Sequence, residues 1–195
     1  MKKLLDEFVK VLQYAKSPVV NHLNKGINTE RIDSIVKEFD VSLPVEAADL
    51  FKWRNGTNIE GLQKLQLETW IFPLASFISL ETCMSVYKQC MDMRYQWKEN
   101  LFVIFDSGIG DLFMIDVNEN SATKGMIFMD SPAAVDFLGP VTVFDSLAAC
   151  IETQIECYKK GAYVIEEGTL VVINHDKKVE ISKQNNSKSE YWKEL

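Results

Sequence analysis

Apolar residues recur at helical spacing in several stretches of the chain. Near the N-terminus, Leu5, Phe8 and Leu12 stand three and four residues apart, which predicts an amphipathic helix over residues 2–15. Pro44 fits the first position of a later helix, where its missing N–H costs nothing. The same reasoning predicts helices over residues 29–39, 44–53, 80–97 and 146–160.

Three short apolar runs in the middle of the chain, residues 102–106, 112–116 and 126–130, each close on an aspartate. Short apolar runs bounded by Gly, Asn and Asp are typical of interior strands. The first connection, residues 107–110, has the length of a hairpin turn, and the second, residues 118–124, is a longer polar loop. The sequence therefore predicts an antiparallel β-meander.

Further patterns flank this meander. Residues 66–72 indicate a strand that ends at Pro73, and residues 163–182 indicate two further strands with breaks at 166–168 and 174–176. The last dozen residues are polar, and we expect them to fray. Together these elements predict an α+β fold, a single domain with helices packed on a largely antiparallel sheet. We expect this domain over residues 1–160, with 161–195 as a C-terminal strand extension and polar tail, in the same domain or appended to it.

Charge is distributed unevenly along the chain. The 195 residues carry 21 Lys and Arg against 28 Asp and Glu, a formal net charge of −7. Residues 101–158 hold one basic residue, Lys124, against nine acidic ones, so this segment alone carries −8. An acidic balance argues against nucleic acid or an anionic membrane as a direct partner, because clustered Lys and Arg hold phosphates. It permits a basic protein partner.

The cysteines and the N-terminus predict a cytoplasmic protein. Each of the pairs Cys83/Cys90 and Cys150/Cys157 is spaced i, i+7 in a predicted helix, about 10 Å apart along the axis. That distance is too long for a disulfide within a pair, which favours reduced thiols. Acidic residues at positions 6 and 7 interrupt any signal-peptide core, and no apolar stretch is long enough to span a membrane.

Carboxylates form the one candidate chemical cluster. In an antiparallel meander, Asp106, Asp111 and Asp130 lie at the same end of the sheet. Three interpretations are open: a metal-binding or catalytic pair, an acidic edge that recognises a partner, or acidic residues that only terminate strands. The calcium-loop pattern is absent, so we predict neither a metal ion nor a cofactor. Our predicted partner-binding edge comprises Asp106, Asp111, Asp130, Asp116, Glu119 and Asp136.

The order of several landmarks resembles a known family. These landmarks are Leu43-Pro44-x-Glu46, Phe51 and Trp53, Asn55-Gly56, Pro73-Leu74, Leu80-Glu81, the 102–106 strand, Gly110-Asp111, Asp116 and Ser131. Their order and spacing resemble the SUKH superfamily, the Smi–Knr-type domain, over about residues 28–160. The residues after Gly161 fall outside the resemblance.

The resemblance implies a single α+β domain without enzymatic activity. Bacterial members are mostly immunity proteins that bind and neutralise toxins, and fungal members are regulatory adaptors. The matching positions Leu43, Pro44, Glu46, Asn55, Gly56 and Asp111 are then structural. We therefore expect a cytoplasmic immunity protein that binds a basic cognate toxin, such as a nuclease, through its acidic surface. The alternative is an adaptor for a non-toxin partner; a carboxylate hydrolase is disfavoured because no His, metal or nucleophile pattern accompanies the acids.

Overall fold

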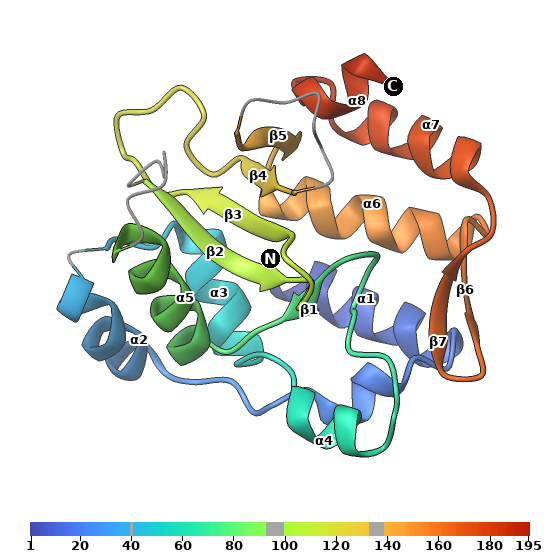
Figure 1. Cartoon of the computed structure of the whole chain (residues 1–195), viewed down its shortest axis with the longest axis horizontal. Helices are drawn as coiled ribbons and strands as arrows, with labels where there is room; N and C mark the ends of the chain where they lie inside the picture. The colour runs from blue at the N-terminus through green and yellow to red at the C-terminus, as the bar shows by residue number, and fades with distance from the viewer. Residues whose placement is uncertain (40, 93–99, 133–138) are drawn as a thin grey trace.

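The computed structural model describes residues 1–39, 41–92, 100–132 and 139–195. Its centre is a five-stranded antiparallel sheet in the order β1-β2-β3-β4-β5 (Figure 1). The strands are β1 (Ser76–Phe77), β2 (Leu101–Asp106), β3 (Leu112–Asp116), β4 (Ile127–Asp130) and β5 (Val141–Phe144). Neighbours in the sheet are neighbours in the sequence, so the sheet is a meander. The α+β fold predicted from the sequence is confirmed.

Helices surround the sheet. They are α1 (Lys2–Tyr14), α2 (Thr29–Val36), α3 (Val45–Trp53), α4 (Ile59–Lys64), α5 (Leu80–Asp92), α6 (Leu147–Lys159), α7 (His175–Asn185) and α8 (Glu190–Glu194), with 3₁₀ turns η1 (Pro18–His22) and η2 (Lys37–Phe39). Helix α1 packs against α6 and α3, and α5 packs against β2 and α2. Five consecutive residues of β2 are buried, so both faces of this strand are covered. One continuous hydrophobic core results.

The predicted strand over residues 66–72 is wrong. This stretch follows the end of α4 as a loop, and the strand of this region is β1, four residues further on. Positive φ angles at Gln66 (56°) and Leu74 (65°) interrupt the extended backbone on both sides. The apolar pattern has a different cause: the ring of Phe72 enters the core and lies 5.0 Å, centroid to centroid, from the ring of Phe105.

The C-terminal residues are more ordered than the sequence indicates. A two-stranded hairpin, β6 (Tyr163–Glu166) and β7 (Thr169–Val172), confirms the first part of the predicted extension. Helix α7 then occupies residues 175–185, so the prediction of strand as far as residue 182 is wrong; the helix packs on α6.

The prediction of a frayed polar tail is also wrong. Helix α8 packs against β5, and Trp192 is 4% exposed. Its indole Nε1 donates a hydrogen bond to the Val143 carbonyl at 2.7 Å, and its ring lies 6.4 Å from that of Phe144. The segment after residue 160 therefore packs on the same body as the sheet, as Figure 1 shows.

Candidate functional site

The β2–β3 turn brings the first two predicted carboxylates together. Asp106 ends β2, and its Oδ1 accepts a hydrogen bond from the Gly108 amide at 2.7 Å. The Ser107 hydroxyl accepts bonds from the amides of Ile109 and Asp111, at 3.1 and 2.9 Å. These bonds fix the turn and present Ile109, 71% exposed, at its tip. Asp106 itself stays partly exposed beside it.

Asp111 and Asp116 take structural positions. Asp111 is 6% exposed and accepts a hydrogen bond from the hydroxyl of Ser131. Asp116, at the opposite end of β3, is 4% exposed and accepts bonds from the Asn118 amide at 2.9 Å and the Thr123 hydroxyl at 2.7 Å. Buried carboxylates that are bonded in this way order the following loop and present almost no surface to a partner.

Asp130 ends β4 at the same end of the sheet as Asp106. Leu112 of β3 pairs with Asp106 on one side and with Asp130 on the other, so the two aspartates are two strands apart. Burial, and secondarily the charge of Asp111, raise the pKa of the Asp130 carboxyl. Burial and the charges of Asp130 and Asp106 likewise raise the pKa of the Cys90 thiol, so Cys90 lies in the field of both aspartates.

The remaining predicted acids are neutralised or lie elsewhere. Glu119 forms an ion pair with Lys124 at the opposite end of the sheet, and Asp136 lies outside the described residues. We therefore define the acidic edge as the partly exposed pair Asp106 and Asp130. Partner binding by each of the predicted residues stays a prediction.

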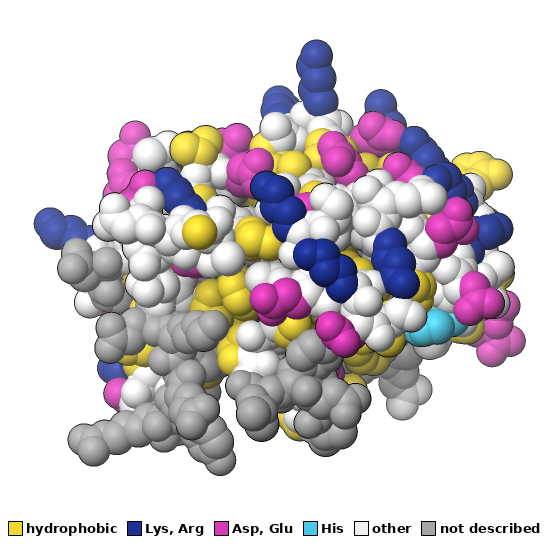
Figure 2. Space-filling model, turned by 90° about the horizontal axis from the view of Figure 1, so that it is seen from above, with side chains coloured by type: hydrophobic (Ala, Val, Ile, Leu, Met, Phe, Trp, Pro, Cys, Tyr) yellow, Lys and Arg dark blue, Asp and Glu magenta, His cyan; other side chains and the backbone are white. Residues whose placement is uncertain are grey.

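The described acidic residues of the segment 101–158 lie at several separate places on the fold. Asp145 accepts from the Lys188 amide, and Glu156 pairs with Lys160 at 2.6 Å on α6. Figure 2 shows acidic and basic side chains interspersed over the face that it presents. The charge that is concentrated in the sequence is dispersed by the fold, which leaves the acidic edge as a local feature.

Comparison with protein families supplies the next observation. The family model described as SMI1 / KNR4 family (SUKH-1) matches residues 26–153, which is about two thirds of the chain. The chain belongs to the SMI1/KNR4 family. Members of the SUKH group are commonly toxin-immunity domains. No curated protein matches the chain.

The SMI1/KNR4 landmark Asn55-Gly56 joins three elements of the fold. The Asn55 side chain donates to Glu81 Oε2 at 2.9 Å and accepts from the Leu80 amide at 2.8 Å, at the start of α5. Gly56 has a φ of +76°, and a Cβ there would stand 2.4 Å from the Ser79 amide nitrogen. Only glycine fits this position without strain.

Glu81 shows how tightly this junction is bonded. Burial alone would raise its pKa, but hydrogen bonds from Asn55, from its own backbone amide and from Arg31 outweigh burial, so the pKa of Glu81 is lowered. Arg31 of α2 also forms an ion pair with Glu81 at 3.0 Å. Of the other landmarks, Pro44 caps α3, which begins at Val45 and not at Pro44 as expected, and Glu46 lies in its first turn. Leu43 is partly buried and packs on the core.

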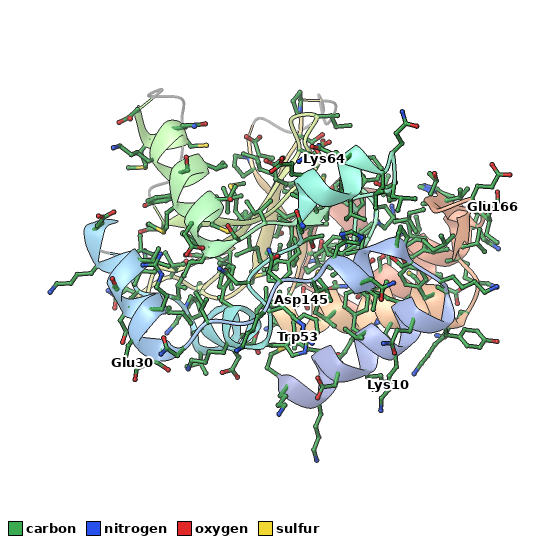
Figure 3. The ribbon with its side chains drawn as sticks, turned by 90° about the horizontal axis from the view of Figure 1, so that it is seen from below. Lys10, Glu30, Trp53, Lys64, Asp145 and Glu166 are labelled. Atoms are coloured by element: carbon green, nitrogen blue, oxygen red, sulfur yellow. The ribbon has the colours of Figure 1, made fainter. Side chains whose placement is uncertain are left out.

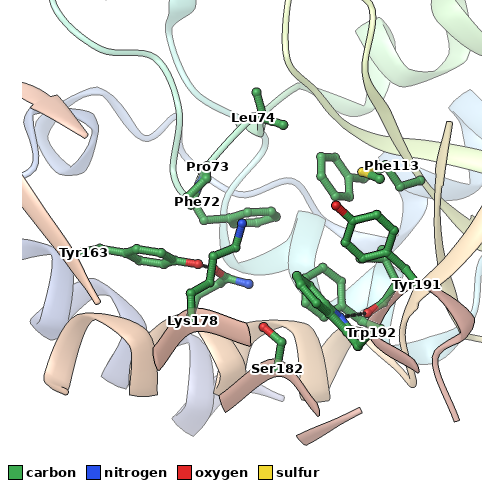
Figure 4. A pocket seen from close by; sticks show the side chains of 13 residues that line it. Phe72, Pro73, Leu74, Phe113, Tyr163, Lys178, Ser182, Tyr191 and Trp192 are labelled. Atoms are coloured by element: carbon green, nitrogen blue, oxygen red, sulfur yellow. Dashed lines mark hydrogen bonds between the residues drawn. The ribbon is translucent and has the colours of Figure 1, made fainter. Parts of the chain in front are cut away.

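A small aromatic cavity lies where the SMI1/KNR4 sheet meets the C-terminal helices (Figure 4). Its volume is about 60 Å³, and Phe72, Tyr163, Tyr191 and Trp192 contribute to its walls. Lys178 of α7 extends into it, with Nζ 5.7 Å from the Trp192 ring centre. Burial lowers the pKa of Lys178. Sequence patterns missed this cavity, because its walls come from eight segments that are separated along the chain.

The described residues show no metal centre and no redox pair. Among them no group of three or more His, Cys, Asp or Glu side chains is placed to hold a metal ion. The four cysteines are free; Cys83, Cys150 and Cys157 are buried and Cys90 is partly exposed. Over the described ranges, no helix is long and apolar enough to cross a membrane.

Proposed function

We propose that this protein is an immunity protein that neutralises a cognate bacterial toxin by binding it. The observation that carries the proposal is the family match over residues 26–153. We propose further that the toxin is basic, as nucleases that hold nucleic-acid phosphates are, and that the acidic edge, Asp106 and Asp130, contributes to its capture.

The energetics of Asp130 support a role in binding. Its raised pKa means that the charged carboxylate, which is the form present at neutral pH, destabilises the folded protein. An amide of the same size would avoid this cost. A charge that destabilises the free protein is common where a partner supplies the opposite charge.

The position of the edge supports fast capture. Asp106 and Asp130 lie at the same end of a rigid sheet, on β2 and β4 with β3 between them, and the exposed Ile109 side chain lies in the turn that follows Asp106. Complementary fields raise association rates toward about 10⁸–10⁹ M⁻¹s⁻¹ at low ionic strength. Early capture protects a cell when the toxin acts soon after entry.

Co-expression with the product of the neighbouring gene, scored for growth rescue and for a stable complex, tests the function itself. The acidic edge is tested by stopped-flow association with that toxin across ionic strengths. We expect the Asp106→Asn/Asp130→Asn double variant to associate about tenfold more slowly at low salt and with a shallower salt dependence.

The matched control is Glu152→Gln/Glu156→Gln, which removes two carboxylates of the same acidic segment from α6, and we expect it to associate as the wild type does. If both double variants slow association equally, net charge and not the acidic edge is responsible. If growth is never rescued by the wild type, the immunity function is wrong.

A further inference from the structure

The outer edge of β6 has hydrogen-bonding groups that no described residue uses. The Ile173 amide donates to the Ala162 carbonyl at 3.0 Å, so Ala162 and Ile173 form a hydrogen-bonded pair of the hairpin. Bonded and non-bonded pairs alternate in antiparallel strands. The pairs Tyr163–Val172 and Ile165–Leu170 are then the non-bonded ones. The amides and carbonyls of Tyr163 and Ile165 therefore point away from β7.

This free edge lines a groove of about 760 Å³. The groove contacts three consecutive residues of β6, Tyr163 to Ile165, and none of β7, as expected where a strand presents its edge. The C-terminal half of α1 forms the facing wall, with Val11, Tyr14 and Ala15. Tyr14 is 92% exposed at the lip. The volume lies in the range of ligand-binding clefts.

The rim of the groove is basic, although the molecule as a whole is acidic. It carries Lys10, Lys16 and Lys159 against one carboxylate, Glu7. Glu7 pairs with Lys159 at 2.5 Å, so the charges of Lys10 and Lys16 have no ion-pair partner among the described residues. Figure 3 shows Lys10 on α1 and Glu166 near the tip of the hairpin. An occupant with carboxylates complements this rim.

All twelve residues that line the groove lie outside residues 26–153, the range that matches the family. Helix α1 precedes that range, and the end of α6 and β6 follow it. The groove is thus built by the segments that this chain adds at both ends of the family domain.

We propose that the groove binds an extended segment of a protein partner, which adds as a strand to the free edge of β6. The segment presents apolar side chains to the floor and carboxylates to Lys10 and Lys16. Main-chain bonds to the β6 edge, chiefly at Ile165 because Tyr163 is only 3% exposed, supply affinity, and the lysines select the acidic segment. A second copy of this chain fits less well, because its own β6 edge carries the same basic rim, Lys10 and Lys16, and like charges would face each other.

The inference is independent of the proposed toxin. It is tested by selecting a display library of random nine-residue peptides on the full-length protein, and by measuring the binding of the enriched peptides by fluorescence anisotropy. We expect enrichment of acidic residues alternating with apolar ones. Hydrogen exchange measured by NMR should show that the Ile165 amide becomes protected in the complex.

Two variants, each with a matched control, locate the site. Ile165→Pro removes the outward amide, and we expect about tenfold weaker binding, since a hydrogen bond contributes about 1–1.5 kcal/mol. Val172→Pro removes the equivalent amide from the opposite edge and should bind as the wild type does. Lys10→Glu/Lys16→Glu should weaken binding about tenfold, whereas Lys2→Glu/Lys3→Glu, at the other end of α1, should not.

Circular dichroism establishes that each variant is folded, and the lysine variants keep the test decisive if Ile165→Pro unfolds. The proposal is overturned if no peptide is enriched, if the enriched peptides are basic, or if the edge variants bind as tightly as their controls. It is equally overturned if the protein forms a dimer that Ile165→Pro dissociates, because the occupant is then a second copy.

Discussion

At the scale of single residues, the aspartates that end the strands divide into two roles. Asp111 and Asp116 are buried and accept hydrogen bonds from hydroxyl groups of later residues, Ser131 and Thr123. Asp106 and Asp130 end β2 and β4 at the same end of the sheet and remain partly exposed. Sequence position placed Asp106, Asp116 and Asp130 correctly at the ends of strands, and Asp111 lies in the turn just before β3. Sequence position could not separate the roles, because the residues that bury a carboxylate are 7 and 20 positions away.

Asp130 provides the residue-scale prediction. Its pKa in the folded protein exceeds the ordinary value of 3.8, so the folded state holds this proton to higher pH than the unfolded state does. Below pH 3.8 the Asp130 carboxyl is protonated in both states and its ionisation does not affect stability. As the pH rises through the folded pKa, the carboxyl ionises in the folded state too, and the free energy of unfolding falls. We therefore expect Asp130→Asn to raise the free energy of unfolding at pH 7, with a gain that shrinks toward pH 3.

Urea denaturation between pH 3 and pH 8 measures this difference. Glu152→Gln, an exposed substitution on α6, is the control and should change the free energy of unfolding by no more than about 0.5 kcal/mol. A gain for Asp130→Asn that stays constant down to pH 3 would contradict the titration argument and point to a packing effect of the amide.

At the scale of elements, the strands were predictable where burial is continuous. The runs that form β2, β3 and β4 are apolar along nearly their whole length, since both sheet faces are covered. The loop over residues 66–72 has a similar pattern for another reason, because it places Phe72 in the core while its backbone bonds elsewhere. Helix α7 has a polar composition, and its helical state depends on packing against α6. Local patterns contain no information on such contacts.

Helix α8 depends on one residue, and it gives the element-scale prediction. Trp192 is 4% exposed, packs on Phe144 and bonds to the Val143 carbonyl. We expect Trp192→Ala to lower the free energy of unfolding by about 3–5 kcal/mol, the usual cost of deleting a buried aromatic side chain. Thermal and urea denaturation measure it. Leu195→Ala, at a position that is 57% exposed, should be nearly neutral; equal effects would mean that α8 does not dock in solution.

At the scale of the whole molecule, the chain adds both its ends to a family domain that spans residues 26–153. Helix α1 packs on α6, α7 covers another side of α6, and α8 covers β5. Helix α6 is accordingly buried over most of its length, including Cys150 and Cys157. The same additions create the basic groove on an otherwise acidic molecule. The segments at the two ends of the chain therefore both stabilise the fold and form the proposed groove.

Because these segments pack on one another, we expect the family domain to need residues 161–195 for its stability. A chain that ends after Lys160 would expose Phe144 and Val143, now 3% and 2% exposed, together with the α7-facing side of α6. We expect this truncated chain to unfold at a markedly lower temperature or to aggregate, because it loses several buried aromatic and aliphatic contacts at about 25 cal/mol per Å². The full chain should unfold in one transition, with tryptophan fluorescence and far-ultraviolet circular dichroism coinciding. A truncated chain with the full-length unfolding midpoint would show that residues 161–195 are an appended segment.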